Sequence, residues 1–368
     1  MRILVAPDKF KDSLTATEAA AEIAAGVRDQ LPHADITILP VADGGEGTAD
    51  ILCRALAGIW HECDAADALG RTVRARYCTT HDGSRAVIET SEAIGLRKIP
   101  LSQRDPDAAS SYGVGEMLLD AAAREVNEIN VGLGGSATND AGVGMARALG
   151  YRFLDSTGVA LNGCVSDLSR LDRILSPATM QLPRITVAAD VMNPLLGSRG
   201  ATDLFSKQKG AGAYQRELLK AALMRVADVA ASDLGTDARE QPGAGSAGGL
   251  GYGLVTFCGA RLRSGFDVVA ETIGLAEAIN GADVVITGEG RLDAQTAEGK
   301  APAGVARLAR AAGKPVYAIV GAASGGNEVF DGVITLVTPA ITPNDAISRA
   351  GELLRARGSE LALLLARS

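Results

Sequence analysis

Short apolar runs alternate with amphipathic segments along the first sixty residues of the chain. Residues 2–6 form an apolar run typical of a buried strand, and Thr15 followed by Glu18 is the capping-box pattern that begins a helix, predicted over 16–31. A second strand is predicted at 36–41 and a second helix at 48–56. Strands that alternate with helices predict a parallel sheet covered on both faces.

The middle of the chain has a different pattern. Residues 71–79 and 85–90 each alternate between apolar and polar positions around the turn at 81–84, which predicts an antiparallel hairpin. Further on, the pattern predicts strands at 129–131 and 185–189 and helices at 113–126 and 215–232. Residues 243–253 contain six glycines and are predicted to form a loop.

From residue 267 the first pattern returns. It predicts strands and helices at 268–279, 283–287, 301–312, 316–320, 332–337 and 344–366. We therefore predict an α/β fold with two domains, which suits a chain of 368 residues. Residues 1–61 and 267–368 would form a discontinuous, Rossmann-like domain with an open, mostly parallel sheet, and residues 62–266 would form an inserted, mixed α/β domain.

Composition and charge exclude several classes of protein. The net charge is −8, with no dense tract of lysine or arginine, so nucleic acids and anionic membranes are not expected partners. The chain shows neither a signal peptide nor an apolar run of about 18 residues, and its five cysteines and three histidines follow no zinc or disulfide pattern. A cytoplasmic location is expected, while the oligomeric state is not indicated.

Four polar clusters each follow a predicted strand. They occupy residues 8–13, 43–48, 190–193 and 288–293, and most combine carboxylates with glycine or lysine. One such cluster alone would be a solvated turn, but ligands of open parallel sheets bind beyond the carboxyl ends of the strands. Four clusters at such positions predict one shared site. Lys300 lies just before a predicted helix, where its charge is unfavourable unless an anion binds beside it. Lys209 is a similar candidate that ranks lower.

The segment GLGGSATNDAG at 132–142 permits two interpretations. Gly132, Gly134 and Ala137, with Asp155 further on, match a dinucleotide fingerprint, which would make the protein an NAD-dependent dehydrogenase of a small hydroxy acid. That fingerprint does not require the hydroxyls, amide and carboxylate at 136–140, which instead suit a polyphosphate with a metal ion. A non-catalytic sensor of hydroxy acids is a third hypothesis, but it has no need of so many carboxylates.

Six segments together resemble the bacterial glycerate kinase family. They are APDKFKDSLTA, PVADGGEGT, GLGGSATNDAG, ADVMNPLLG, GAGSAGGLGYG and GEGRLDAQTAEGKAPAGVA, in the order of the family and over nearly the whole chain. The resemblance implies transfer of phosphate from ATP to glycerate, two α/β domains, and a site in the cleft between them. It also makes the dehydrogenase interpretation much weaker. One departure is Lys207, where the family usually has proline.

Within this resemblance, the candidate residues take roles in direct transfer from MgATP to D-glycerate, giving 2-phosphoglycerate in preference to 3-phosphoglycerate. The expected catalytic residues are Asp190 as the base, Lys300 at the transferring group, and Lys9. The phosphates of ATP would lie on Gly134, Gly135, Ser136, Thr138 and Asn139. Glycerate would be bound by Asp8, Lys11, Asn193 and Arg291. Mg²⁺ would lie among Asp43, Asp140, Glu289 and Asp293.

Overall fold

The structure, a computed structural model, describes residues 1–293 and 300–366. The chain divides into two compact units. The first contains residues 1–43, 50–55 and 266–368, and the second contains residues 44–49 and 56–265. Residues 44–49 and 56–61 thus pack with the second unit, although the sequence assigned them to the first domain. The predicted α/β fold class is confirmed, and each unit is described by itself below.

The first unit is built on a five-stranded sheet in the order β13-β12-β11-β1-β2, in which all neighbours run parallel. Its strands are β1 (Arg2–Val5), β2 (Asp35–Ile38), β11 (Val284–Leu292), β12 (Val316–Ala323) and β13 (Gly332–Thr335). The accompanying helices are α1 (Ala16–Gln30), α2 (Thr48–Ala55), α9 (Gly265–Thr272), α10 (Leu275–Gly281), α11 (Ala301–Ala311), α12 (Pro343–Ser348) and α13 (Ala350–Leu365).

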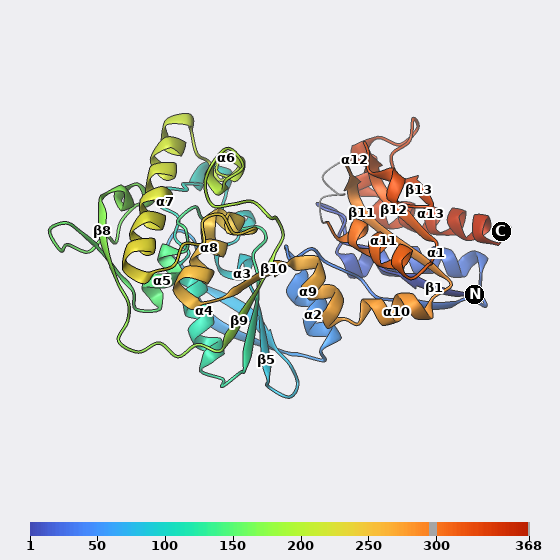
Figure 1. Ribbon diagram of the computed structural model, residues 1–368. Helices are drawn as coiled ribbons and strands as arrows, with labels where there is room; N and C mark the ends of the chain where they lie inside the picture. Colours follow the sequence, from blue (N-terminus) through green and yellow to red (C-terminus); the bar gives the residue numbers. More distant parts are fainter. Residues whose placement is uncertain (294–299, 367–368) are drawn as a thin grey trace. The chain divides into compact units, whose positions relative to one another are not determined.

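Both faces of this sheet are covered, which explains why its strands read as continuous apolar runs. Ile3 and Val5 lie in one buried cluster with residues of α1 and α13, whereas Leu4 and Ala6 lie in another with residues of α10 and α11. The chain ends both belong to this unit, where α1 and α13 lie side by side (Figure 1). The capping box at Thr15 is confirmed.

The second unit contains a six-stranded mixed sheet in the order β10-β9-β6-β5-β4-β3. Strands β10 (Arg261–Ser264), β9 (Arg184–Ala189), β6 (Glu128–Gly132) and β5 (Arg85–Glu89) are parallel, and β4 (Thr72–Thr79) and β3 (Ile59–Ala66) continue the sheet antiparallel. The hairpin of β4 and β5 is confirmed, but β3 was not predicted. A separate antiparallel pair, β7 (Arg152–Asp155) and β8 (Leu171–Leu175), was also missed.

The helices of the second unit are α3 (Ser91–Ile94), α4 (Tyr112–Ala122), α5 (Val143–Ala148), α6 (Ala201–Phe205), α7 (Ala213–Leu234) and α8 (Ser246–Cys258). Short 3₁₀ turns occur at Leu96–Lys98, Leu101–Gln103 and Val165–Arg170 here, and at Asn327–Val329 in the first unit.

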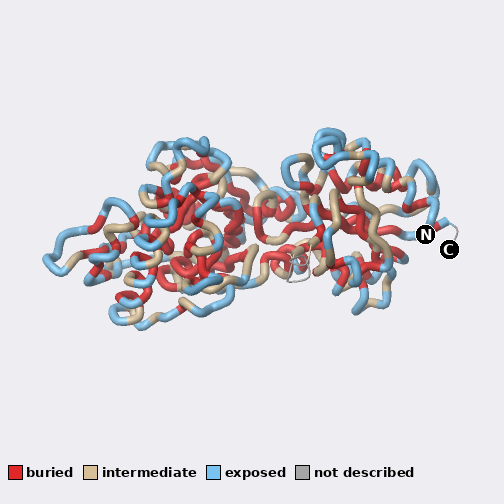
Figure 2. The backbone as a smooth tube through the Cα atoms, turned by 90° about the horizontal axis from the view of Figure 1, so that it is seen from above, coloured by how far each residue is buried: buried red, intermediate tan, exposed pale blue. Residues whose placement is uncertain are grey.

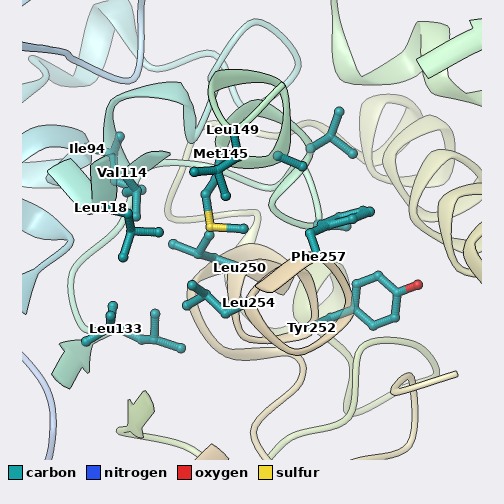
Figure 3. Close-up of a cluster of buried hydrophobic side chains, with 14 of the residues drawn as sticks. Ile94, Val114, Leu118, Leu133, Met145, Leu149, Leu250, Tyr252, Leu254 and Phe257 are labelled. Carbon is teal, nitrogen blue, oxygen red and sulfur yellow. The ribbon is translucent and has the colours of Figure 1, made fainter. Parts of the chain in front are cut away.

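The prediction of a loop at 243–253 is wrong in its second half: α8 is assigned from Ser246, residues 247–249 have left-handed backbone angles, and regular helix runs from Leu250. Leu250 and Leu254, one helical turn apart, are both fully buried in the core of the second unit together with Phe257. Figure 3 shows these side chains around Met145. The predicted helices at 268–279 and 344–366 are each divided in two, at Gly274 and at Arg349.

Buried backbone is concentrated in the interior of each unit and exposed backbone in its outer turns (Figure 2). Among residues 1–293 and 300–366, no helix combines the length and the apolar character needed to cross a membrane.

Candidate functional site

The first unit has a pocket at the carboxyl ends of its central strands. Asp8 follows β1, Asp43 follows β2, and Glu289 lies in the last part of β11. Because these strands are parallel neighbours, residues that follow them gather at one edge of the sheet. The pocket has a volume of about 730 Å³, and seven predicted site residues line it: Asp8, Lys9, Lys11, Asp43, Glu289, Arg291 and Lys300.

Acidic and basic groups are crowded together in this pocket. The Lys9 ammonium lies 3.4 Å from Asp43 Oδ1 and 4.0 Å from Asp8 Oδ1. The main-chain N–H of Lys9 also donates to Asp8 Oδ1, at 2.6 Å. Burial raises the pKa of Asp8 to about 7; Lys9 opposes the shift, whereas the charges of Asp43 and Glu289 add to it. Four carboxylates and four cationic side chains therefore line the first-unit pocket, and burial keeps Asp8 protonated up to near neutral pH.

Lys300 lies immediately before α11 and lines the same pocket. Its ammonium is 3.4 Å from Asp293 Oδ1, and both side chains are about one-third exposed or less. Asp293, which the sequence predicts as a metal ligand, is thus paired with a cation. The six residues between this pair, 294–299, belong to the last of the six family-like segments and lie outside the described residues.

Carboxylate oxygens are the protein ligands that Mg²⁺ prefers, and it commonly takes only one or two of them beside phosphate oxygens. Asp43 and Glu289 supply two such carboxylates at the first-unit pocket. Within the described part of the chain, no group of three or more histidine, cysteine, aspartate or glutamate side chains is arranged to hold a metal ion by itself. The residues present therefore fit a metal ion that shares its coordination with a ligand.

Asp140 does not fit the metal site predicted for it. Its buried carboxylate accepts four hydrogen bonds: from the N–H and hydroxyl of Ser111, both at 2.8 Å, from Gly144 N–H at 3.0 Å, and from Gly142 N–H at 3.1 Å. A carboxylate with so many internal donors has its oxygens already occupied. Asp140 instead fixes the start of α5, in the manner of a helix cap.

The loop at 132–142 connects β6 to α5 in the second unit, and its glycines have separate structural reasons. Gly135 has a φ of +73°, in the left-handed region that favours glycine. Gly134 has a different role, because a Cβ atom there would lie 2.3 Å from the Cα atom of Gly45. Gly134 therefore permits two backbones to pass in close contact, and Gly135 is the exposed residue of the segment 132–140.

Thr138 and Asn139 face the interior of the second unit. Both are fully buried, and the Asn139 amide donates to Thr202 Oγ1 at 3.0 Å, while Asn139 Oδ1 has no hydrogen-bond partner among the described residues. Their side chains thus support the loop from inside. Ser136 is also buried.

Lys209, which the sequence ranked low, contacts the loop at 132–142 directly. Its side chain is buried, and its ammonium donates to the Thr138 carbonyl at 2.6 Å and to Ser136 Oγ at 3.4 Å. Burial lowers the pKa of Lys209 to about 8, against the opposing charges of Asp140 and Asp190. A lysine between two polar residues of a turn looks solvent-exposed in the sequence, so only the fold reveals this contact.

Asp190 and Asn193 follow β9 in the second unit. Asp190 is half-buried, and its negative charge opposes the lowering of the Lys209 pKa. Asn193 accepts a hydrogen bond from Gly245 N–H at its main-chain carbonyl, at 2.8 Å, and this joins it to the start of α8. The four strand-following clusters therefore divide into a group on the first unit and a group on the second.

The geometry removes the basis of the dinucleotide fingerprint. In that fingerprint a helix opens directly from the glycine turn, and the acid ends the next strand of the same sheet. Here α5 begins only at Val143, and Asp155 ends β7 in the separate two-stranded sheet. The Asp155 carboxylate accepts from the Thr157 hydroxyl and from the N–H groups of Thr157 and Val159, which makes it a turn residue.

Comparison with known proteins gives one consistent result. Residues 3–366 match the family model of the glycerate kinase family. The chain is 40% identical to a glycerate kinase of Bacillus subtilis, over 98% of this chain and 97% of that one, and 38% identical to a glycerate 2-kinase of Escherichia coli, over 100% and 98%. A crystal structure assigned as a glycerate kinase 2 from Salmonella typhimurium LT2 is 40% identical, with a TM-score of 0.86 over 100% of this chain and 98% of that one.

Proposed function

The chain belongs to the glycerate kinase family of phosphotransferases, and we propose that it transfers the γ-phosphoryl group of ATP to the 2-hydroxyl of D-glycerate, giving 2-phosphoglycerate. The observation that carries this proposal is the first-unit pocket, in which four cationic side chains and four carboxylates line one cavity. Support for the 2-hydroxyl comes from the Escherichia coli relative, whose name is glycerate 2-kinase.

The first-unit pocket suits a small hydroxy acid. Glycerate has one carboxylate and two hydroxyls, and a cation is the natural partner of the carboxylate. Lys9, Lys11 and Arg291 line the pocket, and we assign the carboxylate to them. Asp8, at the buried end of the group, would accept a hydrogen bond from a glycerate hydroxyl.

Phosphoryl transfer is mostly a matter of positioning the reactants and neutralising charge. We assign Lys300 to the charge on the transferring group, and the backbone of residues 134–139 to the phosphates of the nucleotide. Asp43 and Glu289 would hold Mg²⁺, which supplies charge neutralisation for the phosphates when bound. Asp140 is withdrawn from that set, because internal donors occupy its oxygens.

Asp190 is our candidate for the group that accepts the proton of the attacking hydroxyl. It is a half-buried carboxylate at the end of a strand. A carboxylate that follows a strand of the parallel part of the sheet is a residue type that serves as a general base.

A coupled assay for ADP, with phosphorus NMR of the product, tests the reaction. We expect ADP only when ATP, D-glycerate and a divalent metal are all present, and a product spectrum of 2-phosphoglycerate. Full turnover in EDTA would contradict the requirement for a divalent metal. A spectrum of 3-phosphoglycerate would contradict transfer to the 2-hydroxyl. ATP-independent reduction of NAD by a hydroxy acid would support the dehydrogenase instead.

Two matched variants test the base. Asp190→Asn should lower kcat by roughly 100-fold or more, in the range known for general acid–base groups. Asp155→Asn should leave kcat unchanged, since Asp155 serves only its own turn. A change confined to the KM for glycerate in Asp190→Asn would make Asp190 a binding residue and place the base elsewhere.

A further inference from the structure

A buried lysine in the second unit is not used by the proposed reaction. Lys209 lies in the turn after α6, and the backbone around it is tightly fixed: its own N–H and that of Ala211 both donate to the Ser206 carbonyl, at 3.0 Å. The Ser206 hydroxyl is bound in turn to the Thr202 carbonyl. This turn directs the Lys209 side chain into the interior, where only 3% of the residue is exposed.

Burying an ammonium group costs free energy unless polar partners compensate for the lost water. For Lys209 the partners are the Thr138 carbonyl at 2.6 Å and Ser136 Oγ at 3.4 Å, both in the loop at 132–142. The acids whose charges act on it are Asp140 from the same loop and Asp190 from the end of β9. On the other side of the turn, the Arg104 guanidinium donates to the Gln208 carbonyl at 3.0 Å.

The Thr138 carbonyl is held from two sides. Lys209 donates to it, and Gly248 of α8 packs so closely that a Cβ atom there would lie 1.9 Å from the Thr138 oxygen. Because a trans peptide group is planar, fixing the direction of this carbonyl also fixes the opposite direction of the next N–H, that of Asn139. Lys209 therefore controls the orientation of a main-chain donor in the segment 134–139.

We propose that Lys209 is a positioning residue for nucleotide binding: its ammonium group, through the Thr138 carbonyl and the Ser136 hydroxyl, keeps the backbone of residues 134–139 in the conformation that accepts phosphate. The identity of the ligand rests on the proposed function, whereas the control of the loop does not. A charged donor forms a stronger hydrogen bond than a neutral one. Because burial lowers the pKa of Lys209 to about 8, the side chain loses its charge, and the hydrogen bond weakens, just above neutral pH.

The test compares Lys209→Met, Lys209→Arg and the control Lys207→Met, which removes an exposed lysine from the same turn. Two measurements are made on each protein: hydrogen exchange of residues 132–142 by mass spectrometry, and the affinity for MgADP by calorimetry. In Lys209→Met we expect exchange in this loop to become faster and MgADP binding to weaken, each by about tenfold or more, since a charged hydrogen bond is lost. Lys209→Arg should recover part of both, and Lys207→Met should match the wild type.

Steady-state kinetics separates positioning from general damage to the fold. Lys209→Met should raise the KM for ATP and leave the KM for glycerate unchanged. In the wild type the KM for ATP should rise between pH 7 and pH 9, and in Lys209→Arg it should stay constant because arginine remains charged. Where Lys209→Met is too unstable to purify, this pH comparison alone decides.

Three results would overturn the proposal. One is an unchanged loop and unchanged nucleotide affinity in Lys209→Met. Another is a lower melting temperature with normal affinity of the folded protein, which would make Lys209 purely structural. The third is the same pH dependence in the wild type and in Lys209→Arg. If the wild type binds no MgADP, the proposed function fails, and hydrogen exchange still shows whether Lys209 holds the loop.

Discussion

Asp8 connects the first-unit pocket to the stability of the protein. Its carboxyl is buried, and its pKa is raised to about 7, whereas an aspartate in an unfolded chain ionises near 3.8. The folded state therefore keeps a proton that the unfolded state loses between these two values. It follows that the contribution of Asp8 to the free energy of unfolding is full below about pH 4 and is lost as the pH rises to 7.

Asp8→Asn should remove this dependence, because asparagine resembles the protonated acid at every pH. The stability of the variant relative to the wild type should increase by roughly 2 to 4 kcal/mol between pH 4 and pH 7. Urea unfolding in metal-free buffer measures it, with Asp12→Asn, an exposed acid nearby, as the control. A difference that does not vary with pH would show that Asp8 ionises as an ordinary aspartate.

Sequence reasoning identified the residues of the first-unit pocket because a general rule places them there. Residues that follow neighbouring parallel strands meet at one edge, so Asp8, Asp43 and Glu289 are found together. No such rule gives the direction of a side chain in a loop. Asp140 looked like a metal ligand but points at internal donors, and Lys209 looked exposed but is buried.

At the scale of elements, α8 is a buried helix although its high glycine content predicted a loop. Its glycines serve close packing: a Cβ atom at Gly253 would lie 2.6 Å from the Ala141 carbonyl oxygen, and one at Gly251 would lie 2.4 Å from that of Gly243. The large side chains that alternate with these glycines, Leu250, Tyr252 and Leu254, are fully buried. A glycine-rich segment with large apolar residues can therefore be a core helix. Strand β3 was missed because three of its eight residues, His61, Glu62 and Asp64, are polar and interrupt the apolar pattern.

Gly248 in α8 and Gly259, the residue that caps the end of α8, allow backbone strain to be distinguished from steric contact. Gly248 and Gly259 have φ values of +70° and +63°, so alanine is strained at both. A Cβ atom at Gly259 meets nothing within 4 Å, whereas one at Gly248 meets the Thr138 oxygen. Gly259→Ala should cost about 1 kcal/mol, and Gly248→Ala should cost roughly 2 kcal/mol more and weaken MgADP binding.

Chemical unfolding and calorimetry of the two alanine variants check this expectation. Equal losses of stability would mean that the loop at 132–142 moves away easily, and would weaken the argument that Thr138 is held between Lys209 and α8.

At the scale of the whole molecule, each unit has its own core and can be tested separately. The single tryptophan, Trp60, lies in β3 of the second unit, with the Arg76 guanidinium 4.3 Å from its ring centroid. In the first unit, α1 and α13 touch through Gly26, where a Cβ atom would lie 2.0 Å from the Arg355 carbonyl oxygen. Tryptophan fluorescence thus reports one unit and the helix contact tests the other.

Gly26→Val should separate α1 from α13 and destabilise the first unit by several kcal/mol, since the clash is with backbone. We expect circular dichroism to show an earlier thermal transition and the tryptophan fluorescence transition to stay at its wild-type temperature. Gly281→Val, an exposed position in the same unit with nothing within 4 Å of the added Cβ, is the control. A common shift of both signals would show that the two units unfold together.

The central position of β1 sets the order in which the chain can fold during synthesis. Arg2 is bound to Asp283, 281 positions later, and β1 pairs with β11 as well as with β2. At roughly 5 to 20 residues per second, a ribosome needs on the order of 15 to 60 s to produce that partner. During this interval the second unit is completed, whereas the apolar face of α1 has not yet packed against α13. We therefore expect the newly made N-terminal segment to depend on holding chaperones, and the second unit to reach its native state first.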